Sequence, residues 1–202
     1  MNFAVAHRSL ARRSAQRVLS EEAWFGTANE LVAAMDLLEP QIKNFWDALG
    51  IGAGIVDRKN SEPAPEHRLI NVHMMLAGFA IENLCKGYLA GRLSPKQRKK
   101  VKDGVLPKSL NTHKIVNLLA RTKMKLCHRE KDLIQRITNA IWWRGRYPSP
   151  TSHEEIIPFA QWDSDVDKIK AFLQKLRAHV GVKDSYRCQD PNVIAVSPWT
   201  DN

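Results

Sequence analysis

The chain has 202 residues, of which 44% are hydrophobic, and it carries a formal net charge of +10. This composition is ordinary for a globular protein, and no segment approaches the roughly 18 consecutive apolar residues that a membrane-spanning helix requires. Its three cysteines cannot all pair, and no secretory signal with an apolar core begins the chain. We therefore expect a soluble cytoplasmic protein with free thiols and no membrane partner.

Residues 1–19 are expected to form a basic N-terminal tail. They contain no acidic residue and four arginines, namely Arg8, Arg12, Arg13 and Arg17. The segment is also rich in Ser and Ala, which is the composition of an organelle transit peptide. We interpret it as a frayed or amphipathic tail, although composition does not separate this from a targeting segment.

A first helix is expected to begin near Ser20, which can cap it. Glu21 and Glu22 follow at the positive end of the helix dipole. Apolar residues then recur close to a 3.6-residue period. Because Pro40 interrupts this pattern, we expect a kink or a break there. The Gly- and Pro-rich residues 50–66 indicate a connecting loop.

The most hydrophobic predicted helix spans about residues 67–89, and its apolar residues on nearly every side indicate the centre of a bundle. Residues 92–108 then hold seven Lys and Arg against one Asp. Their Pro and Gly residues indicate a basic loop or small insertion. Such charge favours RNA or DNA as a partner, although solvated basic flanks that aid solubility have the same composition. The candidate nucleic-acid-binding residues are Lys96, Arg98, Lys99, Lys100 and Lys102.

Two further helices are expected before the last loop. Thr112 can cap a short helix that carries Ile115 and Leu118. A longer amphipathic helix follows over about residues 130–143. Four Gly and Pro residues within 145–158 then require the chain to leave the helix.

A final amphipathic helix is expected after a cap at Asp163 or Ser164, and Gly181 ends it. Residues 183–202 have no helical period and form an irregular C-terminal tail. No segment has the pattern of a strand strong enough for a sheet. The fold class is therefore all-α, with one helical domain over residues 20–182.

Three stretches resemble the HEPN family of small helical proteins. They are GFAIENLCKG at 78–87, THKIVNLL at 112–119 and IWWRGRYPSP at 141–150, and their order and spacing agree with the family. The chain is most similar to small prokaryotic members with a Gly-Arg-Tyr-Pro-x-Pro turn. The resemblance implies an up-and-down bundle of four to five helices that forms a homodimer and acts on RNA.

Many HEPN proteins cleave RNA without a metal, using an arginine followed closely by a histidine. The one fit here is Arg146, then six residues, then His153. Histidine suits proton transfer near neutral pH, and a guanidinium stabilises charge on a phosphate. Because Pro148 and Pro150 preclude a regular helix between them, His153 is expected on a loop.

The resemblance also implies roles for polar residues elsewhere in the bundle. Glu82 is the third candidate catalytic residue, and the supporting candidates are Lys86, Arg144, His113 and Tyr147. A purely structural interpretation competes with this one. Glu82 lies on a mostly apolar side of its helix and needs a partner, such as Lys86 at i+4 or an arginine across the bundle.

The other supporting residues have structural interpretations as well. His113 fits a helix N-terminus at which it bonds a neighbour. Tyr147 belongs to an aromatic cluster with Trp142 and Trp143 that suits either stacking on bases or a packed dimer interface.

Three functions follow as hypotheses. The first is a metal-independent ribonuclease of toxin or defence type, with an antitoxin-like protein partner. The second is a non-catalytic HEPN module that binds RNA, a nucleotide or a partner protein. The third is a helical structural partner. Because the sequence contains no P-loop, dinucleotide-binding fingerprint, serine-hydrolase elbow or zinc ligand set, we expect neither cofactor nor metal.

Overall fold

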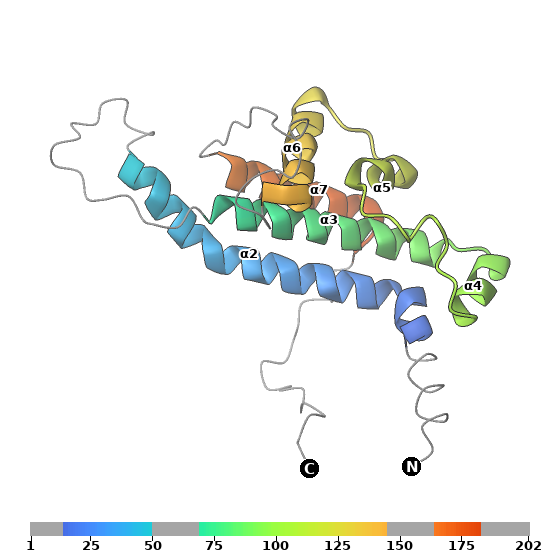
Figure 1. Ribbon diagram of the computed structural model, residues 1–202. Helices are drawn as coiled ribbons and strands as arrows, with labels where there is room; N and C mark the ends of the chain where they lie inside the picture. The colour runs from blue at the N-terminus through green and yellow to red at the C-terminus, as the bar shows by residue number, and fades with distance from the viewer. Residues whose placement is uncertain (1–13, 50–68, 145–163, 183–202) are drawn as a thin grey trace, which may run out of the picture.

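The computed structural model describes residues 14–49, 69–144 and 164–182, and all regular structure in these ranges is helical (Figure 1). The predicted all-α class is confirmed for this part of the chain, which contains no strand. The predicted tail at 183–202 and the loop at 50–66 lie outside the described residues. None of the described helices has the length and apolar character needed to cross a membrane.

Two long helices, α2 (Glu21–Leu49) and α3 (Ile70–Gly91), lie antiparallel to each other and in contact along their length (Figure 1). Ser20 caps α2 as predicted, since its Oγ accepts a hydrogen bond of 3.1 Å from the backbone N–H of Ala23. Of the kink or break predicted at Pro40, the break is wrong, because α2 continues through the proline as one helix. Met35 and Ile42, on either side of the proline, are both buried, so tertiary packing offsets the backbone bond that proline removes.

Helix α3 occupies the centre of the fold, as its apolar composition predicts. It contacts α2 on one side, and on the other it contacts α5 (Ile115–Thr122), α6 (His128–Asn139) and α7 (Asp165–Val180). The main core contains fully buried aliphatic side chains from each of these helices, including Met35, Ile81, Leu84, Leu118, Ile134 and Ile169. This burial supplies most of the stabilisation that short helices lack by themselves.

The predicted helix over 130–143 consists of two parts. Helix α6 ends at Asn139 and continues as a π-helical turn, η1 (Ala140–Arg144). Ile141 of this turn packs directly on α3 at Gly78, where a Cβ atom would lie 2.2 Å from Cδ1 of Ile141. The glycine therefore allows η1 to approach α3 closely.

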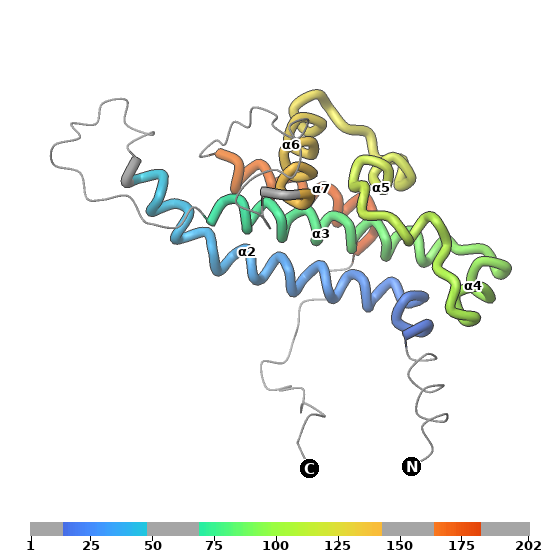
Figure 2. The backbone as a smooth tube through the Cα atoms, in the orientation of Figure 1, coloured from blue at the N-terminus to red at the C-terminus, as the bar shows by residue number. Residues whose placement is uncertain are grey.

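The basic segment 92–108, which we expected to be a loop or small insertion, contains the eight-residue helix α4 (Pro95–Lys102). Ser94 and Gln97 form a reciprocal capping box, and Pro95 occupies a first-turn position that tolerates proline. Val101 of α4 is buried in a small second core with Ala90, Leu93 and Leu110. Figure 2 shows α4 at the C-terminal end of α3. Proline here starts a helix instead of preventing one.

The ends of the last helices match the predictions in part. Thr112 does not cap α5, which begins at Ile115. Instead, Oγ1 of Thr112 accepts a hydrogen bond of 3.2 Å from the backbone N–H of Lys114, in the turn before the helix. Ser164 precedes α7 without capping it through its side chain. Gly181 ends α7 as predicted, with a φ of 76° that glycine adopts without strain.

A close contact between α2 and α3 makes Gly87 sensitive to substitution. A Cβ atom at Gly87 would lie 2.6 Å from Cε1 of Phe25 and 3.1 Å from Cβ of Trp24. We expect Gly87→Ala to lower the free energy of unfolding by about 1 to 3 kcal/mol in urea denaturation, because the two helices must separate. The matched control is Gly26→Ala in α2, where a Cβ meets nothing within 4 Å. It should raise stability by about 0.5 to 1 kcal/mol, and a similar loss in both variants would contradict the packing argument.

Candidate functional site

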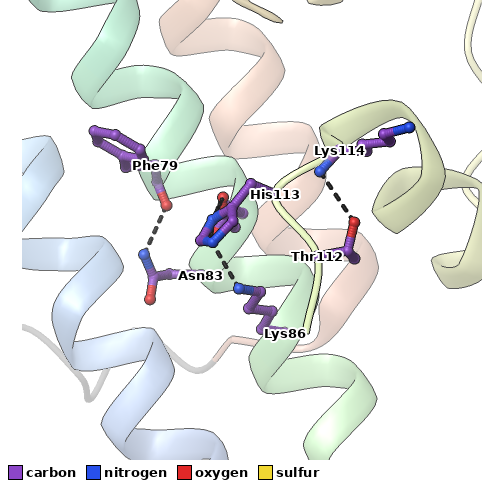
Figure 3. A network of polar contacts seen from close by, with 7 residues as sticks. Phe79, Asn83, Lys86, Thr112, His113 and Lys114 are labelled. Atoms are coloured by element: carbon purple, nitrogen blue, oxygen red, sulfur yellow. Dashed lines mark hydrogen bonds and ion pairs between the residues drawn. The ribbon is translucent and has the colours of Figure 1, made fainter. Parts of the chain in front are cut away.

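Glu82 of α3 is the centre of a polar cluster. Its partners Lys86 and His113 are shown in Figure 3. Glu82 is only 6% exposed, and its Oε1 accepts a bond of 2.7 Å from Nζ of Lys86, one helical turn later. Lys86 is equally buried, and its ammonium lies 5.6 Å from the ring centroid of Trp24. Of the partners considered for Glu82, the structure shows Lys86, in a buried ion pair, whereas the side chains of the candidate arginines lie outside the described residues.

His113 is the third member of the cluster. Its Nδ1 lies 3.0 Å from Oε1 and 3.2 Å from Oε2 of Glu82. Because an ionised carboxylate only accepts hydrogen bonds, the arrangement assigns the proton to Nδ1. In the neutral ring Nε2 is then the unprotonated nitrogen, and it has no hydrogen-bond partner among the described residues. The side chain is 75% exposed, so solvent and ligands reach it.

The turn before α5 holds His113 against α3. Thr112 Oγ1 closes this turn by accepting a hydrogen bond from the backbone N–H of Lys114 (Figure 3). Ile115, the first residue of α5, is fully buried. These two anchors lie on either side of the histidine in the chain. The ring is consequently held over Glu82 while its other edge faces solvent.

Cys85 lies beside the cluster but does not contribute a nucleophile. Burial raises the pKa of its thiol to about 12, and the negative charge of Glu82 acts in the same direction. The thiol is therefore protonated at neutral pH, and only the thiolate is reactive.

The structure thus brings together three predicted site residues: Glu82, Lys86 and His113. The sequence indicated a neighbouring partner for His113 but not which one, because Glu82 precedes it by 31 residues. The remaining catalytic and supporting candidates lie outside what the structure describes. They are Arg146, Tyr147 and His153, together with the side chain of Arg144.

The predicted nucleic-acid-binding residues fall into two groups. Arg98 is used structurally, because its guanidinium donates to the carbonyls of Leu93, Ala90 and Gly91 at the end of α3. This contact orients α4 against α3. The four lysines are exposed, and none forms an ion pair with a carboxylate of the described residues: Lys96, Lys99, Lys100 and Lys102.

The positive charge extends beyond α4. The stretch from Arg92 to Lys125, called here basic segment 92–125, contains eleven Lys and Arg residues and a single acidic residue, Asp103. The basic segment predicted from the sequence ended at residue 108 and did not include the exposed lysines Lys114, Lys123 and Lys125. His113 lies within this segment. The exposed edge of the Glu82 cluster therefore belongs to the most basic part of the chain.

A cavity with the opposite charge lies elsewhere in the fold. It has a volume of about 590 Å³ between α2 and α7, and its lining includes Asp36, Glu39, Asp47 and Asp167. Near it, burial lowers the pKa of His73, whose Nε2 is 3.8 Å from Glu39 Oε1. A cavity with four carboxylates does not suit a polyanionic ligand.

In the described ranges, no three His, Cys, Asp or Glu side chains come together as metal ligands would. No protein-family model matches the chain, and neither a curated protein nor a solved structure matches it. The function is therefore argued from the residues themselves.

Proposed function

We propose that the protein binds RNA through basic segment 92–125. The observation that supports this most directly is the set of exposed lysines on α4, which have no described carboxylate partner. Unpaired surface lysines bind phosphates by releasing the counterions condensed on a nucleic acid. A lysine already paired with a carboxylate would lose that pair on binding and contribute less.

The choice of RNA rests on two further arguments. The motifs at 78–87, 112–119 and 141–150 resemble those of the HEPN family, whose members typically act on RNA or nucleotides. The exposed Nε2 of His113 also suits the chemistry of a ribose 2′-hydroxyl, which DNA lacks. Metal-independent cleavage by Arg146 and His153, a homodimer and an antitoxin-like partner are additional expectations that rest on the resemblance alone.

The experiment is a titration of labelled single-stranded RNA and mixed tRNA followed by fluorescence anisotropy between about 50 and 200 mM salt. The wild type should bind with an affinity that falls steeply as salt rises. Lys99→Gln/Lys100→Gln should weaken binding and reduce the slope of log K against log salt by about 1.4, or about 0.7 for each lost phosphate contact.

The matched control is Lys43→Gln/Lys168→Gln. It removes the same charge from exposed positions on α2 and α7. Binding by this control should stay close to that of the wild type. An equal loss in both double variants would indicate an effect of net charge only, and the absence of salt-dependent binding by the wild type would overturn the proposal.

A further inference from the structure

We propose that Glu82 and His113 form a proton-transfer centre that acts on the phosphodiester bonds of RNA held by basic segment 92–125. The inference rests on the proposed RNA binding and adds a chemical step to it. His113 would be the catalytic residue, and Glu82 the positioning residue that acts through it. The residues of this centre differ from the Arg146 and His153 pair that the family resemblance implies.

The first argument is the geometry of the ring. Glu82 accepts a hydrogen bond from the Nδ1–H of His113, with Nδ1 3.0 Å from Oε1, and this bond sets both the tautomer and the orientation of the imidazole. Nε2 is left as the basic nitrogen. The negative charge of the carboxylate also stabilises the positive charge that the ring acquires when Nε2 takes up a proton, as in other carboxylate–histidine pairs.

The second argument is that the fold does not need His113 as the counter-charge of Glu82. Lys86 supplies that charge from within the protein, at 2.7 Å and with both partners buried. A histidine that only completed the packing would itself be covered, whereas three quarters of the His113 side chain is exposed. An exposed hydrogen bond of this kind contributes little to stability, so positioning the ring is its more substantial effect.

The reaction follows from the chemistry of RNA. Nε2 takes the proton of a ribose 2′-hydroxyl, the 2′-oxygen attacks the adjacent phosphorus, and a new P–O2′ bond forms as the P–O5′ bond breaks. The products are a 2′,3′-cyclic phosphate and a strand with a 5′-hydroxyl. The leaving 5′-oxygen takes up a proton from solvent, and His113 returns its proton to solvent, so the step needs no metal, oxidant or other reactant.

The test measures cleavage and binding separately on the full chain, with single-stranded RNA in EDTA. We expect the wild type to release fragments that end in a 2′,3′-cyclic phosphate. His113→Ala should slow cleavage by about 10²- to 10⁴-fold while its affinity for RNA stays unchanged. Added imidazole should partly restore its rate, which would not happen if the histidine were only structural.

Two further variants make the assignment specific. His128→Ala removes another exposed histidine, which has no carboxylate partner in the described ranges, and it should cleave at the wild-type rate. Glu82→Gln should slow cleavage in the wild type but have no additional effect once His113 is alanine, because it acts through the ring. Circular dichroism checks that each variant is folded.

The possible failures are distinguishable. RNA binding without cleavage would overturn the proton-transfer centre and leave the proposed binding function intact. Cleavage that is lost in Arg146→Ala and His153→Ala but retained in His113→Ala would also overturn it. If the wild type does not bind RNA, the proposed function fails and this inference fails with it.

Discussion

Asp165→Ala is expected to lower the free energy of unfolding by about 3 to 5 kcal/mol. Asp165 is the first residue of α7 and is completely buried, and its Oδ2 accepts a hydrogen bond from Nη1 of Arg136 on α6. Arg136 is itself only 8% exposed. Removing the carboxylate leaves a guanidinium inside the protein without its buried counter-charge, and water cannot reach it well enough to compensate.

The second ion pair of Arg136, with Asp132, provides the control. Nε of Arg136 donates a bond of 3.1 Å to Oδ2 of Asp132, whose side chain is 60% exposed. Because water screens this second pair, Asp132→Ala should change stability by no more than about 0.5 kcal/mol. Urea denaturation of the two variants measures the difference. Equal losses would show that burial does not govern the strength of these pairs, contrary to the argument.

The second large effect concerns the pair beneath the candidate site. Glu82→Leu should lower the free energy of unfolding by about 3 kcal/mol or more, because it leaves the buried ammonium of Lys86 without a counter-charge. Lys86→Met should cost less, since Glu82 keeps its bond to the exposed His113. The double variant Glu82→Leu/Lys86→Met should lose less than the sum of the two single changes, because apolar side chains can occupy the same space without a desolvation cost.

Chemical denaturation of all three variants completes this double-mutant cycle. Lys175→Met is the control, because Lys175 pairs with Glu130 at the surface and its loss should cost under about 1 kcal/mol. Additive losses in the cycle would mean that Glu82 and Lys86 do not stabilise each other. The cycle measures stability only, so its outcome is independent of RNA cleavage.

Some features of the chain could be predicted because their causes are local. Ser20 caps α2 by accepting a hydrogen bond from the backbone N–H of Ala23, three residues later. Lys86, one of the partners considered for Glu82, pairs with it from the next helical turn. Gly181 ends α7 because glycine adopts the left-handed conformation that such an end requires. The position of α3 at the centre followed from apolar residues on nearly every side.

One error was also local. The Ser94 and Gln97 capping box that begins α4 is visible in the sequence, but the Pro and Gly residues of the segment indicated a loop or small insertion. Here the proline is compatible with the helix because it lies in the first turn, where its missing N–H is not needed. The Ser94 and Gln97 pair is the local signal that predicts this helix.

The sequence by itself determined the helical class, the start of α2 and the end of α7, because each depends on residues within about one turn of one another. Only the tertiary structure decided which distant groups meet. It brought His113 into contact with Glu82, 31 residues earlier in the chain. It also directed the guanidinium of Arg98 to the carbonyls at the end of α3, whereas the neighbouring lysines form no ion pair with a carboxylate of the described residues. It also stabilised α2 as one continuous helix through Pro40, because residues on both sides of the proline are buried. Such contacts depend on how whole helices pack, and packing is a property of the complete core that no short stretch of sequence specifies.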